Sequence, residues 1–158
     1  MPRTLSSLLD DKWNSVQRFV ALGEGYGAAR ELSDLAELTA KLSNDEKQAW
    51  SQKMDSIYLS PECVNQAIGR GLSEIAYARR LIADVEDLID DEVILMLSKL
   101  MSLRSVERYL HRKGNVSWST ELAALWKEVD RLRESGNVGA AIRRCEATIR
   151  RNTDIRLA

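Results

Sequence analysis

Four arginines stand in two adjacent pairs near the end of the chain, at positions 143–144 and 150–151. A guanidinium group is planar, always charged, and donates paired hydrogen bonds to a carboxylate or a phosphate. At about 100° per residue, both pairs fall on the same side of a helix. The other side carries a stripe of apolar or small residues, namely Val138, Ala141, Ile142, Cys145 and Ile149. The spacing therefore predicts an exposed cationic strip on an amphipathic helix.

Arg131, Arg133 and Arg156 extend this strip in the sequence. Two interpretations stay open, namely a surface that binds a partner and a solvated face that complements acidic neighbours. No aromatic residue is interleaved among the arginines, which argues against a stacking platform for single-stranded nucleic acid. Trp118, in the polar stretch NVSWST, is a further candidate interface residue. The predicted residues for partner or phosphate binding are Arg131, Arg133, Arg143, Arg144, Arg150, Arg151 and Trp118.

The formal net charge of −1 hides an asymmetry along the 158 residues. Residues 1–98 carry ten Lys and Arg against 17 Asp and Glu, a net charge of −7. Residues 99–158 carry 13 against seven, a net charge of +6, and ten of those 13 cations are arginines. The acidic and basic portions must therefore attract each other, or the basic portion attracts a partner.

Helices are the elements that must position these side chains. The chain has only two prolines, Pro2 and Pro61, and no alternating runs joined by hairpin turns. The spacing of apolar residues predicts seven helices. Their ranges are about 5–22, 26–42, 44–59, 72–89, 90–113 and 120–135, followed by the helix that carries the strip.

Several local signals support these boundaries. Ser43 and Glu46 form a capping-box pattern, and Ser60 followed by Pro61 is a helix start. Gly69 and Gly71 are expected to interrupt the chain after that start, and Gly114 to end the fifth helix in a left-handed conformation. In residues 93–103, eight of eleven side chains are apolar, which predicts a central helix packed on more than one side.

The two ends of the chain share a pattern. A tryptophan-bearing helix, a glycine turn and a helix that opens with GAA occur at 13–29 and again at 126–141, which predicts an αα-hairpin at each end. The second hairpin resembles one tetratricopeptide unit, with Gly136 at the turn and Ala141, Cys145 and Thr148 at the packing positions. Glu128 departs from that pattern, and about 30 residues cannot make a solenoid. The predicted fold is all-α, a compact antiparallel bundle of six or seven helices in one domain, 1–158.

Acidic residues raise an enzymatic alternative. Asp84, Asp87 and Asp91 share a helical face if one helix runs through them, and Glu31 and Asp34 form a second pair. Carboxylates on facing helices resemble the Mg²⁺ sites of all-α nucleotide pyrophosphohydrolases, which implies metal-dependent nucleotide hydrolysis. That family uses glutamate-rich motifs close in sequence, whereas here the two sets lie about 50 residues apart and Asp largely replaces Glu.

His111 is the single histidine. Arg104, six intervening residues and His111 resemble the Arg-x4-6-His motif of the HEPN ribonucleases, in which dimerisation brings two motifs together. Ser105 departs from the polar residue that the family prefers after the arginine. The other interpretation is a cation that complements the dipole at a helix C-terminus, since His111 is followed by Arg112, Lys113 and Gly114.

These patterns predict a non-enzymatic protein–protein interaction module that acts as an adaptor, regulator or inhibitor. The alternative is a nucleic-acid-binding protein that uses the strip, and the third hypothesis is the nucleotide hydrolase or HEPN-like ribonuclease. No catalytic residue, metal ligand or cofactor is predicted, and the partner and self-association stay open. Two distant cysteines, Cys63 and Cys145, and the lack of a signal-peptide or membrane-spanning pattern predict a cytoplasmic protein with reduced thiols.

Overall fold

The computed structural model describes residues 3–115, 118–152 and 155–156. In these residues the protein is an all-α bundle of seven α-helices, with a single 3₁₀ turn at Val85–Asp87. Two short segments, β1 (Arg3–Thr4) and β2 (Ile155–Arg156), pair in parallel. The helices are α1 (Leu5–Ala21), α2 (Gly25–Thr39), α3 (Asn44–Asp55), α4 (Pro61–Ala83), α5 (Asp90–Arg112), α6 (Ser119–Arg133) and α7 (Gly136–Asn152). The predicted fold class is thus confirmed.

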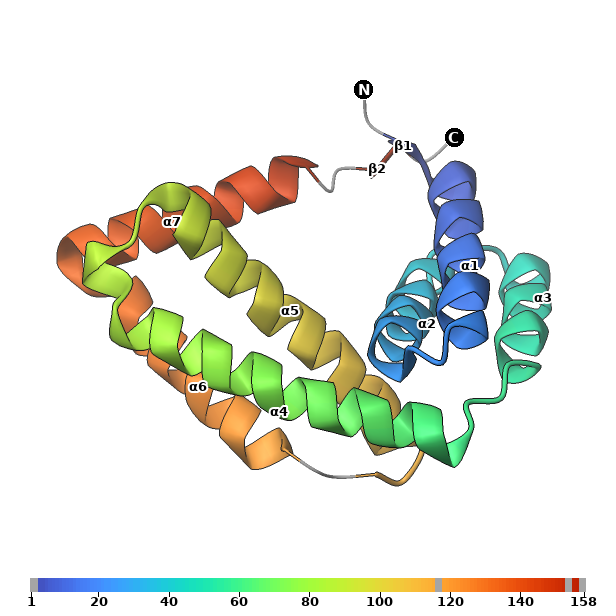
Figure 1. Cartoon of the computed structure of the whole chain (residues 1–158). Coiled ribbons are helices and arrows are strands. Elements are labelled where there is room, and N and C mark those ends of the chain that lie inside the picture. The colour runs from blue at the N-terminus through green and yellow to red at the C-terminus, as the bar shows by residue number, and fades with distance from the viewer. Residues whose placement is uncertain (1–2, 116–117, 153–154, 157–158) are drawn as a thin grey trace.

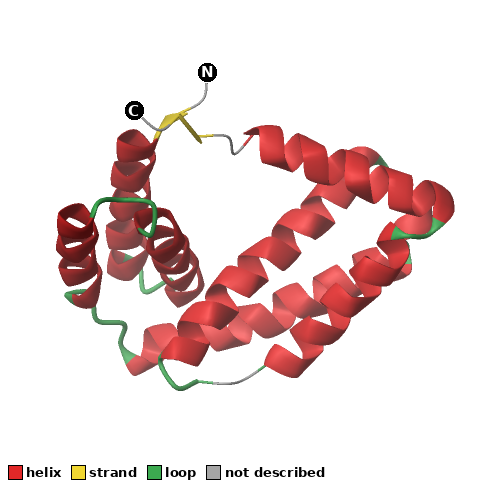
Figure 2. Ribbon diagram, turned by 180° about the vertical axis from the view of Figure 1, so that it is seen from behind, coloured by secondary structure: helices red, strands yellow, loops and turns green. Residues whose placement is uncertain are grey.

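The two longest helices, α4 and α5, run through the middle of the molecule (Figure 1). On one flank, α1, α2 and α3 form a group in which α2 packs against both α4 and α5. On the other flank, α6 and α7 form a hairpin in which α7 packs against α5 and α6 against α4. Seen from behind in Figure 2, the β1–β2 pair links the start of α1 to the end of α7.

Helix α5 is central, as the run of apolar residues predicts. It packs against α2, α4, α6 and α7. Between positions 93 and 103 it buries five apolar side chains, namely Val93, Met96, Leu97, Leu100 and Leu103. A helix that touches four others needs apolar residues around much of its circumference, which explains why no single stripe is visible in its sequence. None of the helices in the described ranges is long and apolar enough to cross a membrane.

Three predicted helix ends are confirmed. Ser43 Oγ accepts a hydrogen bond from the Glu46 amide at 3.4 Å and donates to the Glu46 carboxylate at 2.9 Å. Ser60 caps α4 through the Cys63 amide at 3.2 Å, with Pro61 in the first turn. Gly114 follows the end of α5 with φ of +81°, a conformation that favours glycine. These caps satisfy amide and carbonyl groups that helix ends leave unpaired.

The expected interruption at Gly69 and Gly71 is wrong. Helix α4 runs through both glycines without a break, because a helix tolerates an internal glycine at a cost of about 1 kcal/mol. Gly71 is buried against the Trp118 ring, so it provides room for an indole. The helix predicted over 72–89 is likewise wrong at its end, since α4 stops at Ala83 and the 3₁₀ turn precedes α5.

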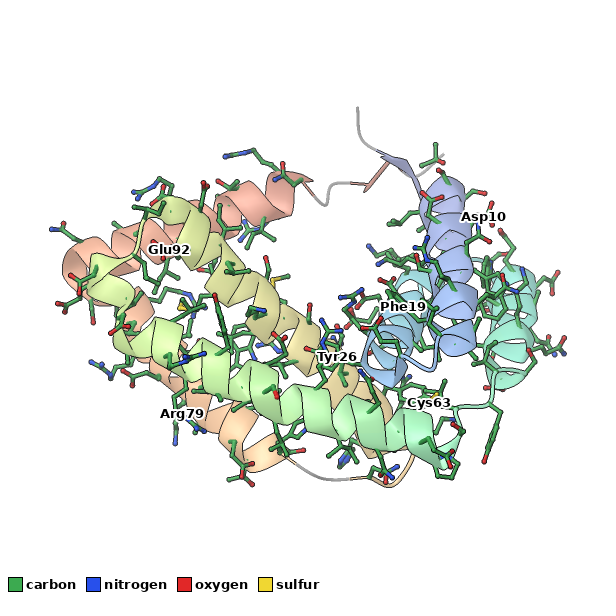
Figure 3. The ribbon with its side chains drawn as sticks, viewed as in Figure 1. Asp10, Phe19, Tyr26, Cys63, Arg79 and Glu92 are labelled. Carbon is green, nitrogen blue, oxygen red and sulfur yellow. The ribbon has the colours of Figure 1, made fainter. Side chains whose placement is uncertain are left out.

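The hairpins at both ends are present, and each turns at a glycine with positive φ. These are Gly23 at +69° between α1 and α2, and Gly136 at +48° between α6 and α7. The glycine of each GAA sequence lies close to the preceding helix. Gly27 faces the ring of Phe19, which lies between α1 and α2 in Figure 3, and Gly139 faces the backbone carbonyl of Arg133. A side chain at position 139 would overlap backbone and push α6 and α7 apart, whereas one at position 27 would displace the Phe19 ring.

Candidate protein-interaction surface

Helix α7 places the strip as its periodicity predicts. Ile142 and Cys145 are buried, and Val138, Ala141 and Ile149 are half-buried. The arginine pairs 143–144 and 150–151 are exposed on the other side. The predicted amphipathic geometry of this helix is thus confirmed.

Arg144 joins the basic portion of the chain to the acidic one. Its Nε and one terminal nitrogen donate to the two oxygens of Asp90 at 2.9 and 2.8 Å. Asp90 is the first residue of α5 and belongs to the acidic stretch 84–92. The neighbouring Cys145 thiol lies 3.6 Å from the Asp90 carbonyl oxygen. A carboxylate thus takes both donors of one strip arginine and ties α7 to the start of α5.

The Asp90–Arg144 pair predicts a pH dependence of stability. The hydrogen bonds from Arg144 lower the pKa of Asp90 below its ordinary value. A carboxyl group with a lowered pKa in the folded state stabilises the fold above its unfolded pKa, and that contribution is lost as the pH falls through the folded pKa. We therefore expect Asp90→Asn to unfold at a lower urea concentration than the wild type at pH 7, with the difference shrinking below about pH 4.

The matched control for this measurement is Asp91→Asn. Asp91 is also exposed in the first turn of α5, so both variants lose the same interaction with the helix dipole. Urea midpoints at pH 7 and pH 3 should change with pH more for Asp90→Asn than for Asp91→Asn. Equal changes for the two variants would show that Arg144 adds nothing beyond the dipole.

Four other predicted arginines also have partners within the protein. Arg131 donates to Glu128 at 3.0 and 2.5 Å. Arg133 donates to Glu146 at 3.0 and 3.1 Å and to Asp130 at 2.6 Å, so it bridges α6 and α7. Arg143 donates to the Arg133 carbonyl oxygen at 2.6 Å, and Arg151 to the Thr148 hydroxyl at 3.2 Å. Hydrogen bonds to carboxylates raise the pKa of Arg131, Arg133 and Arg144 above the ordinary value.

A hollow of about 290 Å³ opens between α5, α6 and α7, where the strip meets the rest of the bundle. Apolar side chains from all three helices line it, namely Leu97, Met101, Trp126 and Ile149. Charged side chains of both signs line it as well, namely Arg104, Asp130, Arg133, Glu146 and Arg150. Two of the predicted residues, Arg133 and Arg150, are therefore part of a larger mixed surface.

Arg104 and Trp126 form the most specific feature of this hollow. The guanidinium carbon of Arg104 lies 3.7 Å from the centre of a Trp126 ring, which is the geometry of a cation–π contact. Stacking leaves the edge of the guanidinium group available for hydrogen bonds in its plane. The Trp126 Nε1 atom is buried and has no hydrogen-bond partner in the described part of the chain. The contact thus joins an oriented cation to an indole donor that lacks an acceptor.

Trp118 lies in the interior, which corrects its assignment to a contact surface. Only 1% of the side chain is exposed, and the indole nitrogen donates to the Ile68 carbonyl oxygen at 3.1 Å. The ring packs on Gly71 of α4. The polar residues around Trp118 predict an exposed loop, but the tryptophan itself anchors the start of α6 to α4.

The carboxylates of the enzymatic alternative are not assembled into a metal site. Lys12 lies 3.0 Å from Glu31 and 3.4 Å from Asp34, so an ammonium group occupies the place between them. The face expected to carry Asp84, Asp87 and Asp91 does not exist, because the chain leaves the helical path between α4 and α5. No group of three His, Cys, Asp or Glu side chains close enough to hold a metal ion occurs in the described ranges.

Arg104 and His111 lie on the same helix but face different surroundings. Arg104 stacks on Trp126 in the hollow between α5, α6 and α7. His111 is exposed and lines a separate hollow between α2 and α5, beside Glu37 and Arg108. Within one chain, these two side chains therefore contribute to different surfaces, and the ribonuclease hypothesis stays a prediction about a dimer.

The sequence-based candidate set lacks Met101, Trp126 and Glu146, which line the hollow with the predicted Arg133 and Arg150. A helical spacing signal is present for all three helices, since positions 146, 149 and 150 on α7 are spaced i, i+3, i+4. Positions 97, 101 and 104 on α5, and positions 126, 130 and 133 on α6, follow the i, i+4, i+7 pattern of one helical face. Each triplet mixes apolar and charged residues, so none resembles a buried stripe or a solvated face.

Comparisons with known proteins give no relative for this chain: no family model matches, and neither curated proteins nor solved structures give a match. Function must therefore be inferred from the chemistry of the site.

Proposed function

We propose that the chain is a protein–protein interaction module, acting as an adaptor, regulator or inhibitor, and that its partner binds over the hollow between α5, α6 and α7. The observation that carries this proposal is that Met101 and Trp126 line one hollow together with charged side chains of both signs. Protein interfaces combine an apolar centre with a polar rim, and tryptophan and arginine are enriched among their strongest contacts. Arg104 and Trp126 supply both residue types at one point.

The partner expected from this chemistry offers an apolar side chain and a neighbouring oxygen acceptor. The apolar side chain would cover Met101 and Ile149, which removes apolar surface from water. The acceptor would face the Arg104 guanidinium, whose stacking on Trp126 already restricts its rotamers. A carboxylate near a hydrophobic residue meets both requirements.

The pairing of the strip arginines favours a protein partner over nucleic acid. A phosphate that approached Arg144 or Arg133 would have to displace Asp90, or Glu146 and Asp130. It would also meet the negative charge of these carboxylates, which opposes the electrostatic attraction that dominates binding to nucleic acid. A protein surface can instead supply charges of both signs to the mixed rim.

Site-specific photo-crosslinking tests the proposal. A photoreactive amino acid at position 101 should crosslink a protein in a lysate of the cells that make this chain. Unlabelled wild type should compete for the crosslink, and Arg104→Gln should compete at least about tenfold less well, since one charged hydrogen bond is worth about that factor. Lys127→Gln, which changes an exposed cation of α6 outside the hollow, should compete like the wild type.

Two outcomes would overturn the proposal. One is a crosslink at position 101 that Arg104→Gln and Lys127→Gln suppress equally. The other is binding of a mixed DNA and RNA pool that weakens steeply with salt and is lost when Arg143, Arg144, Arg150 and Arg151 are all changed to Gln. The second result would establish the strip as a phosphate surface.

A further inference from the structure

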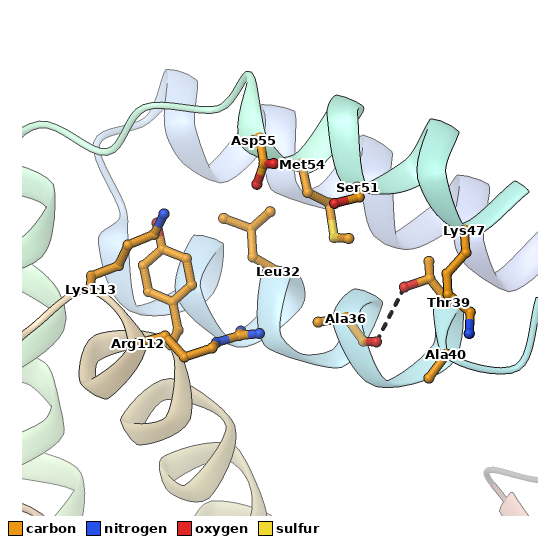
Figure 4. Close-up of a pocket in the computed structure, with 11 residues that line it drawn as sticks. Leu32, Ala36, Thr39, Ala40, Lys47, Ser51, Met54, Asp55, Arg112 and Lys113 are labelled. Carbon is orange, nitrogen blue, oxygen red and sulfur yellow. Dashed lines mark hydrogen bonds between the residues drawn. The ribbon is translucent and has the colours of Figure 1, made fainter. Parts of the chain in front are cut away.

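A second hollow, of about 380 Å³, lies on the opposite flank, between α2, α3 and the end of α5 (Figure 4). Its floor is apolar and consists of Leu32 and Ala36 of α2 and Met54 of α3. Figure 4 shows Leu32 near the middle, with Met54 on the α3 side and Arg112 on the α5 side. The volume is within the range of small-molecule pockets, which are commonly apolar with a few polar groups that fix orientation.

The rim of this hollow carries a local excess of positive charge. Lys47, Arg112 and Lys113 line it, together with one carboxylate, Asp55. In the described ranges, none of the three cations has a carboxylate within ion-pair distance. The Lys113 ammonium lies over the Tyr109 ring at 5.7 Å, and Arg112 extends toward the middle of the hollow in Figure 4. This differs from the strip, where carboxylates engage Arg131, Arg133 and Arg144.

Hydroxyl groups add neutral hydrogen-bonding capacity. Ser51 and Tyr109 also line the hollow. The Tyr109 phenol is protonated at neutral pH and can donate a hydrogen bond, and burial raises its pKa further. Three cations and two hydroxyl donors around an apolar floor are complementary to a molecule that has an anionic head group and an apolar body.

We propose that the hollow between α2, α3 and α5 binds a small amphipathic anion, with its carboxylate or phosphate head group at Arg112 and Lys113 and its apolar body over Leu32 and Met54. This site is separate from the surface between α5, α6 and α7, so the two proposals stand or fall independently. A head group at Arg112 receives charge-assisted hydrogen bonds, and the apolar body removes the exposed part of the floor from water.

Titration with hexyl phosphate and hexanoate tests the proposal with matched probes. Isothermal titration calorimetry should detect saturable binding of one or both. The identity of the tighter ligand decides between a phosphate and a carboxylate head group. Inorganic phosphate lacks the apolar body, and hexyltrimethylammonium carries the opposite charge, so both should bind at least about tenfold more weakly. In methyl NMR spectra, the Met54 signal should shift on binding, while the signal of Met96, which is fully buried elsewhere, should not.

The same titrations are then made on the variant Arg112→Gln and on the control variant Arg79→Gln. Both arginines are exposed, so neither substitution disturbs the core, and Arg79 projects from α4 outside the hollow (Figure 3). Arg112→Gln should weaken the tighter ligand at least about tenfold, and Arg79→Gln should leave its affinity unchanged. Equal weakening by both variants, equal binding of inorganic phosphate, or a ligand that leaves the Met54 signal in place would overturn the proposal.

Discussion

Gly25→Ala is expected to destabilise the protein by about 3 kcal/mol or more, although alanine is a better helix former than glycine. Gly25 is the first residue of α2 and is buried against the backbone carbonyl of Cys63, near the start of α4. A Cβ at this position would lie far inside the usual contact distance of about 3.5–4.0 Å from that oxygen. Because both sides of the contact are backbone, the strain can be relieved only if α2 and α4 move apart.

Urea unfolding of Gly25→Ala, alone and combined with Cys63→Ala, measures this effect. The contact involves the carbonyl of Cys63, which Cys63→Ala retains, so the cost of Gly25→Ala should be the same with and without the thiol. Tyr26, the next residue of α2, donates its amide to Gln66 of α4 at 2.8 Å, so the same displacement would lengthen a hydrogen bond. A higher urea midpoint for Gly25→Ala would show that the helices approach less closely than described.

Helix α7 and the cap of α3 could be predicted from the sequence because their determinants are local. The side of α7 that carries Arg143 and Arg150 follows from 3.6 residues per turn alone. The cap at Ser43 involves a residue only three positions away. In both cases the interacting groups are close along the chain, so their spacing is sufficient information.

The partners of the strip could not be predicted, because they are set by packing. Arg144 reaches Asp90 across 54 residues, and this contact exists only because α7 lies on the start of α5. The asymmetry of charge indicates that acidic and basic portions attract each other, but it does not say which side chains meet. Arg104 and Trp126 illustrate the same limit, since their stacking depends on how α5 and α6 are arranged.

Gly71 and Trp118 both depart from the sequence-based prediction for one physical reason. A single sequence does not distinguish a glycine that breaks a helix from one that admits a neighbour, and the neighbour here is 47 positions away. The sequence neighbours of Trp118 are mostly polar, yet its ring fills the space over Gly71 and its Nε1 donates a hydrogen bond to the Ile68 carbonyl. The small size of Gly71 accounts for the buried position of the Trp118 ring, and the ring accounts for a glycine inside α4. Neither feature can be predicted without the contact between them.

The contact between Gly71 and Trp118 predicts opposite effects on stability for alanine at two glycines of α4, positions 71 and 69. Gly71→Ala should destabilise the protein by about 1–3 kcal/mol, because its Cβ would overlap the Trp118 ring. Gly69→Ala is the matched control. In the described part of the chain, nothing outside the neighbouring turns of α4 lies within 4 Å of the Cβ that alanine would add, so this change should stabilise the protein by about 0.5–1 kcal/mol through helix propensity. Urea midpoints of the two variants should therefore move in opposite directions.

A double-mutant cycle with Trp118→Leu identifies the ring as the cause. Trp118→Leu alone should cost about 3 kcal/mol, because it removes buried apolar volume and the hydrogen bond that the indole nitrogen donates to the Ile68 carbonyl. In that background the space above Gly71 is partly empty, so Gly71→Ala should cost little or become stabilising. The two changes should then be non-additive by at least about 1 kcal/mol, as expected for residues in direct contact. If the two effects add, the requirement for glycine at position 71 comes from the backbone of α4 and not from the Trp118 ring. Gly71 would then resemble Gly25, which is constrained by the Cys63 backbone.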